Sequence, residues 1–398
     1  MSEFRADVTV VGGGIAGLWS AKELIDQGLT VDVVERTESL ANGPTTRNEG
    51  WLHAGTYHSV AVYDEEGARQ VTERTVYGHD AILGFVPESV EHSPSFAIFA
   101  EEDLVQIALR KWDQFNIPHQ EVSKGKFAAD GLDTDRIKGA FAVRDRSVNS
   151  RVIVGRLADY ILDNGGRIFT GAALTPTGGT TADVEIDGER HKFSSDAFLV
   201  TAGVGTKKVF EEITDTPFPM RYFKSHLSVV PRISQDNIFY MDPLEAGLMS
   251  HGGATIVGIN REAVEVETPE YGVLFDKVRL VHDALHRMMP EVGRSALANA
   301  LDVACVKADV ADDVSRRRSV DTTQVLQDLN IKVFEPVEGW VCAIPGKMTE
   351  APALARVAAN RIMSREFSDS EHDGGTNHGH ARPQVTLRPA DRWLTRQP

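Results

Sequence analysis

A strand, a glycine-rich turn and a helix follow one another near the start of the chain, and this order constrains the fold more than any other feature. Residues 8–11 form a short apolar run, which is typical of a parallel strand buried on both faces. Gly12, Gly14 and Gly17 follow with G-x-G-x-x-G spacing. The first of these glycines permits a tight turn, the second lets the backbone approach a pyrophosphate, and the third lets the helix pack closely on the strand. The pattern predicts a dinucleotide-binding unit.

The residues after the glycines complete this unit. Apolar residues at helical spacing predict a helix over residues 15–27, and Ile15 and Ala16 offer free N–H groups to the phosphates at its start. A second strand over residues 29–34 leads into Glu35, whose carboxylate can accept hydrogen bonds from ribose hydroxyls and disfavours a 2′-phosphate. A glycine-rich turn without a ligand is the alternative, but the strand, helix and acid together favour a bound dinucleotide.

The composition favours a globular protein of about two domains and argues against a nucleic-acid partner. The chain has 398 residues, with 42 lysines and arginines against 58 aspartates and glutamates, a net charge of −16. An acidic surface repels phosphate backbones and anionic lipid. No apolar run reaches the ~18 residues that cross a bilayer, and the N-terminus enters a strand without a signal peptide. We therefore expect a cytoplasmic protein with neither a nucleic-acid partner nor an integral membrane segment.

Cysteines and histidines give no sign of a metal centre. Cys305 and Cys342 lie in apolar runs, where buried strand thiols are expected and a reactive pair is the alternative. His372, His378 and His380 fall in a polar, glycine-bearing segment. They could bind metal weakly, but a solvated tail is the better interpretation.

The segment TTRNEGWLHAGTYHS, residues 45–59, follows the strand that ends at Glu35 after a short loop. It resembles the D-amino-acid-oxidase-like flavoprotein superfamily, in which a Ser/Thr-x-Asn-x-Gly stretch follows the ribose acid and runs under the flavin ring. The 2-hydroxyglutarate oxidase and dehydrogenase branch carries Asn-Ser-Gly-Val-Ile-His-Ser-Gly-Ile-Tyr-Tyr at this point. The residues that match in register are Asn48, Gly50, His53, Gly55 and Tyr57.

Two segments in the middle of the chain fit the same resemblance. Residues 150–174 read as a helix followed by a strand, which in the family returns to the nucleotide domain so that the position of Leu174 meets the adenine. An ordinary helix–strand pair is the alternative. Residues 196–209 read as a buried strand that runs into Thr201-Ala202-Gly203, where small residues let the chain pass close to the dinucleotide.

The last matching segment, residues 340–362, reads as a strand, a turn and a helix. In the family such a turn faces the pyrimidine edge of the flavin. N–H groups and Lys347 there would stabilise the negative charge that builds at N1–C2=O on reduction, whereas a solvated surface lysine is the alternative. The predicted FAD contacts are Gly12, Gly14, Ile15, Ala16, Gly17, Glu35, Arg36, Thr45, Thr46, Asn48, Glu49, Gly50, Leu174, Ala202, Gly203, Gly346, Lys347, Met348 and Thr349.

The resemblance implies an α/β protein: a Rossmann-like FAD-binding domain and a second, mainly antiparallel β-sheet substrate domain. We assign residues 1–80, 145–215 and 335–366 to the FAD-binding domain. The substrate domain takes residues 81–144 and 216–334, and residues 367–398 form a flexible tail. Within the substrate domain we expect helices over 101–116 and 268–289, the second ended by Pro290.

Several polar side chains are candidates for the substrate site. Family members take a hydride from a carbon that bears a hydroxyl or an amine, and a histidine near the flavin is a suitable base. His53 is that candidate; a covalent flavin tether and a buried structural histidine are the alternatives. Further candidate catalytic residues are Lys224, His251 and Arg318, with Tyr57, Tyr222 and His226 as possible pocket residues. Lys224 and Arg318 could pair with a substrate carboxylate or phosphate.

Departures from the 2-hydroxyglutarate branch limit what carries over. That branch has Gly-Val-Arg-Ala-Gln near the flavin, and the comparable stretch chosen here, residues 319–324, lacks the arginine. The Lys347 turn is more similar to the Gly-Gly-Lys-Leu-Thr of glycerol-phosphate dehydrogenases. An aromatic-hydroxylase monooxygenase would carry Gly-Asp before the last helix, where this chain has Pro345-Gly346-Lys347.

We therefore predict an FAD-dependent oxidase or dehydrogenase that takes a hydride from a C–H next to a hydroxyl of a small polar metabolite, a 2-hydroxy acid or related alcohol. The alternatives are an amine or amino-acid oxidase on the same fold, an oxidase of a specialised metabolite, and a flavin-binding protein without catalysis. Oxygen or a quinone is the expected electron acceptor, and a monomer or homodimer the expected assembly.

Overall fold

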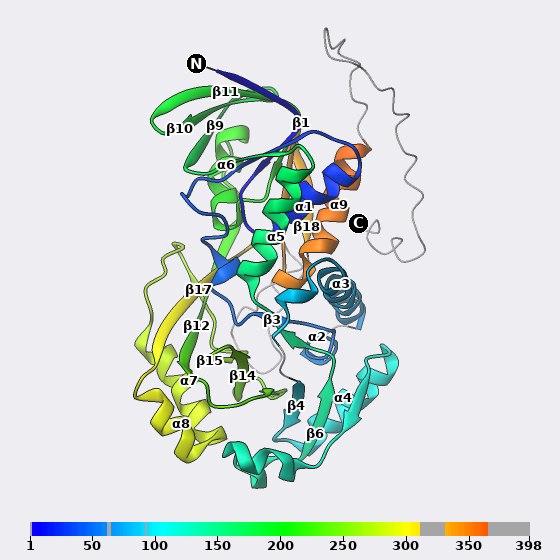
Figure 1. The fold of residues 1–398 in the computed structure, drawn as a ribbon, viewed down its shortest axis with the longest axis vertical. Helices are drawn as coiled ribbons and strands as arrows, with labels where there is room; N and C mark the ends of the chain where they lie inside the picture. The colour runs from blue at the N-terminus through cyan, green and yellow to red at the C-terminus, as the bar shows by residue number, and fades with distance from the viewer. Residues whose placement is uncertain (1, 62–64, 92–93, 311–330, 365–398) are drawn as a thin grey trace.

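The computed structural model of the chain describes residues 2–61, 65–91, 94–310 and 331–364 (Figure 1). Two large sheets organise this part of the chain, the first of eight strands and the second of nine. Arg318 and the predicted tail lie outside the described residues. Within the described residues, no helix combines the length and apolar character needed to cross a membrane.

The N-terminal unit has the predicted strand–helix–strand form. β1 (Glu3–Val11) pairs in parallel with β2 (Val31–Val34), and α1 (Ile15–Asp26) connects them. The glycines act as their spacing suggests, since Gly12 adopts φ +115° and a Cβ on Gly17 would lie 1.9 Å from the Gly12 carbonyl oxygen. Only a glycine lets the helix approach the strand this closely.

The first sheet has the strand order β18-β19-β11-β1-β2-β8, and β9 and β10 extend it antiparallel from β11. Helix α1 packs between α5 and α9 on one face, which Figure 1 shows, while α6 and the β9–β10 extension contribute to the apolar cluster on the other. The remaining elements of this sheet are α5 (Ser150–Asp163), β8 (Arg167–Phe169), β9 (Ala172–Gly178), β10 (Thr181–Ile186), β11 (Glu189–Val200), α6 (Thr206–Thr214), β18 (Lys332–Val337), β19 (Trp340–Ile344) and α9 (Ala351–Met363).

The strand that leads to Leu174 is interrupted. β8 pairs in parallel with β2, but Gly171 then adopts φ +60° and the chain leaves that register. β9 follows and pairs with β10, so Leu174 lies on the antiparallel extension. The glycine between the two halves was the available signal for this break.

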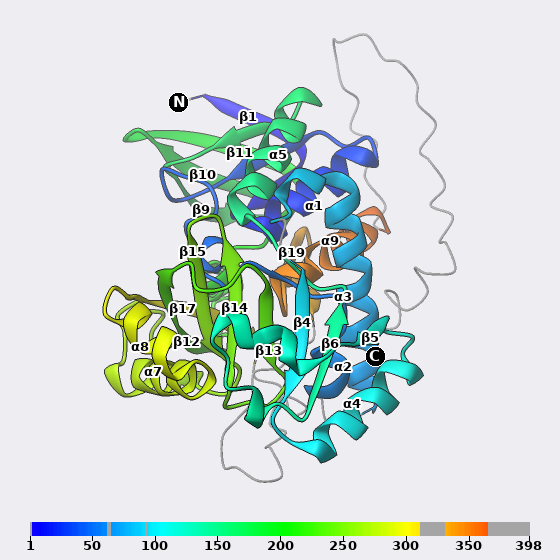
Figure 2. The same cartoon turned by 60° about the horizontal axis from the view of Figure 1, so that its bottom comes forward.

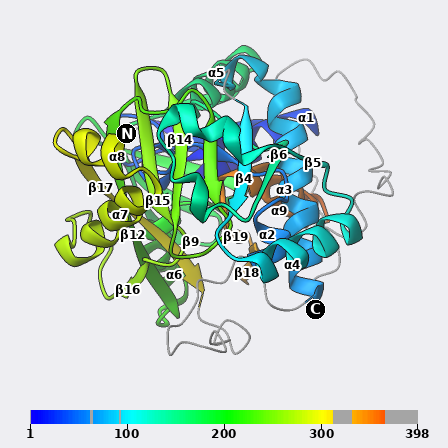
Figure 3. The same ribbon diagram turned by 90° about the horizontal axis from the view of Figure 1, so that it is seen from below.

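The second sheet has the order β16-β12-β15-β14-β13-β4-β6-β5, with β17 also paired to β12. It is mainly antiparallel, as expected, with β13 and β4 as a parallel pair. α7 covers one face, seen from below in Figure 3. The strands of this second sheet and the helices beside it are β4 (Ser95–Phe99), β5 (His119–Glu121), β6 (Gly139–Val143), β12 (Met220–Pro231), β13 (Asn237–Tyr240), β14 (Ala246–His251), β15 (Ala254–Ile259), β16 (Val264–Val266), α7 (Phe275–Met288), α8 (Pro290–Leu297) and β17 (Leu301–Val310).

Two helix predictions in this part of the chain differ in outcome. α4 (Glu102–Gln114) confirms the helix expected over 101–116. α7 begins at Phe275, later than expected, and ends before Pro290. Pro290 does not end the helical region, because it opens α8, where a missing N–H costs nothing at the first helical position.

A 21-residue helix that the sequence did not predict, α3 (Glu65–Phe85), runs along the side of the molecule beside both sheets (Figure 2). The proposed domain boundary between residues 80 and 81 would fall within it, and the domain limits stay a prediction. Short elements flank it: α2 (His58–Ala61) before it, and the two-stranded sheet of β3 (Trp51–Leu52) and β7 (Arg146–Ser147).

Helix α3 holds the turn that precedes α9. Arg74 Nε lies 2.7 Å from Glu350 Oε1, and the side chain of Glu350 is fully buried. One helical turn later, a Cβ built on Gly78 would lie 1.7 Å from the carbonyl oxygen of Thr349. The helix backbone therefore touches the backbone of this turn directly, and an ion pair secures the contact.

We expect Gly78→Ala to lower the free energy of unfolding by about 1–3 kcal/mol, because the added methyl group must push the turn at Thr349 away. Gly155→Ala is the matched control: Gly155 lies inside α5 with nothing within 4 Å of an added Cβ. That substitution should raise stability by up to about 1 kcal/mol. Urea unfolding of both variants checks the contrast, and equal stabilities would contradict the proposed contact.

Candidate active site

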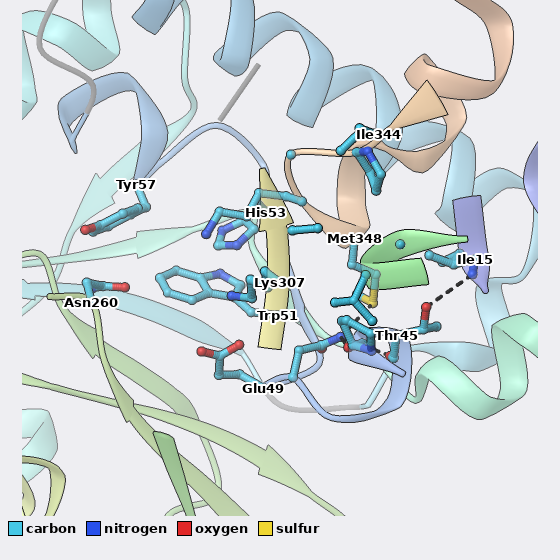
Figure 4. A pocket seen from close by; sticks show the side chains of 18 residues that line it. Ile15, Thr45, Glu49, Trp51, His53, Tyr57, Asn260, Lys307, Ile344 and Met348 are labelled. Carbon is cyan, nitrogen blue, oxygen red and sulfur yellow. Dashed lines mark hydrogen bonds between the residues drawn. The ribbon is translucent and has the colours of Figure 1, made fainter. Parts of the chain in front are cut away.

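Residues of both sheets and of α1 line a cavity with about 950 Å³ of empty space, part of it open to solvent (Figure 4). One end is bounded by the start of α1, the 44–48 loop and the turn before α9, and the other by polar residues of the 49–57 segment and the second sheet. The predicted FAD contacts that line this cavity are Ile15, Thr45, Asn48, Glu49, Gly203, Gly346, Lys347 and Met348.

The start of α1 has room for a phosphate group. Gly14 is the N-cap and has no side chain of its own to cap the helix. A Cβ on Gly14 would meet only Thr45 Oγ1, at 3.4 Å, and the same oxygen accepts a hydrogen bond of 3.2 Å from the Ile15 N–H (Figure 4). Gly203, across the cavity, has φ +55° and nothing within 4 Å of an added Cβ. These small residues fit a pyrophosphate at a helix N-terminus.

Hydrogen bonds hold the carboxylate of Glu35, the acid after β2, in one orientation. Glu35 Oε2 accepts a hydrogen bond of 2.7 Å from the Gly13 N–H. Its Oε1 accepts hydrogen bonds from the N–H and the hydroxyl of Thr37, both 2.8 Å. A carboxylate oxygen can accept two hydrogen bonds, so Oε2 retains capacity for a ribose hydroxyl. The adjacent Arg36 is exposed, and Leu174 is half-buried on β9.

The loop that the sequence places under the flavin is shaped by its own asparagine. Asn48 Nδ2 donates to the carbonyl oxygens of Pro44 and Thr45, at 2.8 and 2.9 Å. Its Oδ1 accepts from the N–H of Gly50 at 2.7 Å, and Gly50 has φ +66°. The Thr46 hydroxyl donates a hydrogen bond of 2.7 Å to the carbonyl oxygen of Ala41. Thr46 and Gly50 thus shape the loop without lining the cavity.

The turn before α9 connects the two ends of the site. Lys347 lines the cavity, and burial, aided by the charge of Lys307, lowers the pKa of its ammonium group to about 8. Thr349 Oγ1 accepts a hydrogen bond of 3.1 Å from the backbone N–H of His53. The turn that α3 holds therefore also fixes the position of His53.

Six polar and aromatic side chains gather at the other end of the cavity, as Figure 4 shows. They are Glu49, Trp51, His53, Tyr57, Asn260 and Lys307. Burial, and then the neighbouring His58, lower the pKa of His53 well below 6.5, so its imidazole is neutral near pH 7. Burial raises the pKa of Tyr57 to about 12, which keeps the phenol a hydrogen-bond donor.

Sequence reasoning missed Lys307, which comes from β17. Burial by itself would lower the pKa of its ammonium group, but Glu49, Cys305 and Glu262 together raise it, so the lysine stays charged. A weak signal was present: residues 305–309, Cys-Val-Lys-Ala-Asp, share the valine and the alanine of Gly-Val-Arg-Ala-Gln, and a lysine stands where that motif has its arginine. Residues 319–324, the stretch expected to match that motif, lie outside the described residues.

Lys224 does not line this cavity. It lies on β12 opposite Val306, so its side chain is on the other face of the sheet from Lys307, which lies opposite Phe223. Its Nζ donates a 3.0 Å hydrogen bond to the carbonyl of Gly272, in the segment between β16 and α7. Because successive side chains along a strand point to opposite faces of the sheet, the two lysines lie on opposite faces.

The other candidate histidines have structural partners. His251 Nε2 donates to the Glu49 carbonyl at 2.8 Å, and its ring fills the space where a Cβ on Gly50 would lie. It supports the flavin loop from outside the cavity. His226 is fully buried: its Nδ1 faces Glu262 at 2.9 Å, and its Nε2 accepts from the Leu274 N–H at 3.1 Å. Both cysteines are buried and free, as expected.

Comparison with known families identifies the chain. The family model for FAD dependent oxidoreductases (DAO) matches residues 7–360. The chain belongs to this family. Among curated protein sequences, none matches this chain. FAD is therefore the cofactor, and the enzyme class and the two-domain fold expected from the sequence are confirmed.

Solved structures of this fold are similar over nearly the whole chain. Glycine oxidase from Geobacillus kaustophilus has a TM-score of 0.68 at 16% identity, covering 93% of this chain and 100% of its own. L-α-glycerophosphate oxidase from Mycoplasma pneumoniae, solved with FAD bound, has a TM-score of 0.70 at 16% identity, with 93% and 97% covered. L-proline dehydrogenase from P. horikoshii has a TM-score of 0.68 at 16% identity, with 92% and 96% covered. At these identities the likeness supports the fold and not the substrate.

We expect Gly14→Val to abolish FAD binding while the chain still folds. The side chain would project from the start of α1 into space left for the pyrophosphate, where an added Cβ has only Thr45 nearby. Flavin absorbance after gel filtration and the far-UV circular dichroism of the apoprotein measure the two effects. A yellow variant with bound FAD would contradict this role for Gly14.

We expect Lys347→Met to lower the flavin midpoint potential by tens of millivolts, because a two-electron couple shifts about 30 mV for each 1.4 kcal/mol of lost charge stabilisation. Lys347→Arg keeps the charge and is the control, with a smaller shift expected. Anaerobic reductive titration against a reference dye gives the potentials. Equal potentials in the wild type and Lys347→Met would remove the proposed effect.

Proposed function

We propose that this chain oxidises a carbon next to a hydroxyl in a small anionic metabolite, with 2-hydroxy acids as the favoured class. The neutral imidazole of His53 at the polar end of the cavity is the observation that carries this proposal. A hydroxyl must lose its proton as the adjacent C–H is broken, and a neutral histidine can accept that proton. An amine in its free-base form needs no such base.

The residues at the other end of the cavity suit FAD. When bound, FAD supplies the hydride acceptor. The N–H groups at the start of α1 would hold its pyrophosphate, that of Ile15 on release from Thr45 Oγ1, and Glu35 would accept hydrogen bonds from its ribose. Lys347 would face the pyrimidine edge. Two observations support these assignments: Glu35 binds the Gly13 N–H next to the N-cap Gly14, and Ile15 and Lys347 line the same cavity.

Lys307 is the proposed anchor for the anionic group of the substrate. Its ammonium group is charged and borders the same part of the cavity as His53. The phenol of Tyr57 and the amide of Asn260 can donate further hydrogen bonds there. Trp51 gives an apolar wall. Because Glu49 is close by, a substrate with one anionic group fits better than one with two.

Oxidation of an amino acid is the second candidate, and Glu49 is the observation that favours it. Its carboxylate borders the cavity and could hold a substrate ammonium group while Lys307 holds the carboxylate. Oxygen or a quinone as electron acceptor, a monomer or homodimer as the assembly, and a covalent flavin link at His53 stay predictions. The mass of the denatured protein tests the link.

Anaerobic flavin spectra test the proposal most directly. A panel of 2-hydroxy acids, glycerol phosphate and amino acids is added to the yellow protein, and bleaching of the oxidised flavin band marks a substrate. His53→Asn should slow bleaching by a 2-hydroxy acid by roughly 10²–10⁴-fold, because the base is lost. Bleaching by amino acids alone, at a rate that does not depend on His53, would replace the first candidate with the second.

Lys307→Met should raise the dissociation constant of an anionic substrate about 10–10²-fold, because one charge-assisted hydrogen bond is lost. Lys224→Met is the matched control, since that lysine lies on the opposite face of the same strand pair. It should leave substrate affinity unchanged. Similar losses in both variants would remove Lys307 as the specific anchor. The concentration dependence of anaerobic flavin reduction gives both constants.

A further inference from the structure

A buried carboxylate lies directly behind His53. Asp145, between β6 and β7, is fully buried. Its Oδ1 accepts a hydrogen bond of 2.8 Å from the indole N–H of Trp51, and its Oδ2 accepts one from the hydroxyl of Thr56. Trp51 and Thr56 flank His53 in the chain, so the carboxylate is held by the segment that carries the proposed base.

One ring nitrogen of His53 faces this carboxylate. His53 Nδ1 is 4.0 Å from Asp145 Oδ1, and within the described chain this buried nitrogen has no hydrogen-bond partner. Of the two side-chain donors to Asp145, only Trp51 binds Oδ1, and a carboxylate oxygen can accept two hydrogen bonds. Since Nδ1 is the buried nitrogen and the ring lines the cavity, Nε2 is the nitrogen left for the substrate.

A neutral imidazole carries one N–H and one lone pair, and the two positions decide what it can do. For His53 to accept a substrate proton, the lone pair must be on Nε2 and the N–H on Nδ1. We propose that Asp145 is a positioning residue that holds His53 in the Nδ1–H tautomer and so turns the lone pair of Nε2 toward the cavity. This inference rests on the proposed function, in which His53 is the base.

His58 is the competing partner for His53 Nδ1. Its ring lies 4.4 Å from the His53 ring between centroids, and both its nitrogens are buried without a partner in the described chain. If His58 donated a hydrogen bond to Nδ1, the lone pair of His53 would lie on Nδ1 and its N–H on Nε2, and Nε2 could not accept a substrate proton. His58 is fully buried. The tautomer of His53 therefore depends on whether Asp145 or His58 interacts more strongly with Nδ1.

The charges around His53 favour the carboxylate. Burial is the largest cause that lowers the pKa of His53. The basic groups that lower it further are His58, Lys347, Lys307 and His79. Asp145 is the acidic group that faces its ring. Burial raises the pKa of Asp145, but hydrogen bonds from Thr56, Trp51 and the Ala54 N–H oppose that rise. When Asp145 is ionised, its charge stabilises the imidazolium that forms when His53 takes a proton.

The test reads the tautomer without any substrate. The FAD-loaded protein is labelled with ¹⁵N in its 13 histidines, and long-range ¹H–¹⁵N spectra distinguish Nδ1–H from Nε2–H rings. His53→Asn identifies the His53 signals. The Nδ1–H form of His53 is expected in the wild type and in His58→Asn, and Asp145→Asn should shift His53 toward the Nε2–H form.

A matched control changes a different acid beside a different histidine. His282 Nε2, on α7, lies 2.9 Å from Asp302 Oδ1, on β17. Asp302→Asn should move the His282 signals and leave those of His53 in place. An Nε2–H form of His53 in the wild-type protein would overturn the proposal, and that spectrum decides even if Asp145→Asn fails to fold. A loss of the Nδ1–H form in His58→Asn but not in Asp145→Asn would assign the role to His58.

Kinetics then separate this inference from the proposed function. Asp145→Asn should slow flavin reduction by an active 2-hydroxy acid at least 10-fold while leaving its dissociation constant within about 2-fold, since the residue acts through His53. A purely structural role would weaken binding as well, and that outcome would count against the proposal. If the tautomer is as expected but His53→Asn reduces normally, the proposed function fails and the assignment of the tautomer stands.

Discussion

The contact between α3 and the turn before α9 is the constraint on which the site depends. Gly78 brings the helix against the carbonyl of Thr349, and the buried pair of Arg74 and Glu350 holds it there. The hydroxyl of Thr349 then receives the N–H of His53. One short turn therefore sets the position of Lys347 at the proposed cofactor end of the cavity and of His53 at the proposed substrate end. A shift of this turn would move both ends together.

The sequence predicted the parts of the fold that local patterns encode. The glycine spacing after β1, the acid after β2 and the Asn48 loop lie where expected, because each depends on residues a few positions apart. Helix α3 was missed because Gly78 and Gly84 weaken its helix propensity. The reason for Gly78 lies at Thr349, far along the chain, so no window of neighbouring residues could show it.

Local sequence also could not show which of two lysines, Lys224 or Lys307, lines the cavity. Lys224 and Lys307 each stand in an apolar strand, and nothing local separates them. The register of β12 against β17 decides which face each side chain takes, and register is a tertiary property. Asp145 was missed for a related reason, since Trp51 and Thr56 precede it by 94 and 89 positions.

The two lysines of the cavity belong to a protein with a net charge of −16. An anion that approaches from a distance therefore meets a repulsive field, and it is attracted only once Lys307 and Lys347 are within about a Debye length, roughly 8–10 Å at physiological salt. Added salt then has opposite effects on the two stages: it screens the repulsion that slows arrival and weakens the attraction that retains the bound anion. The ionic strength of the surroundings sets the balance between fast capture and firm retention.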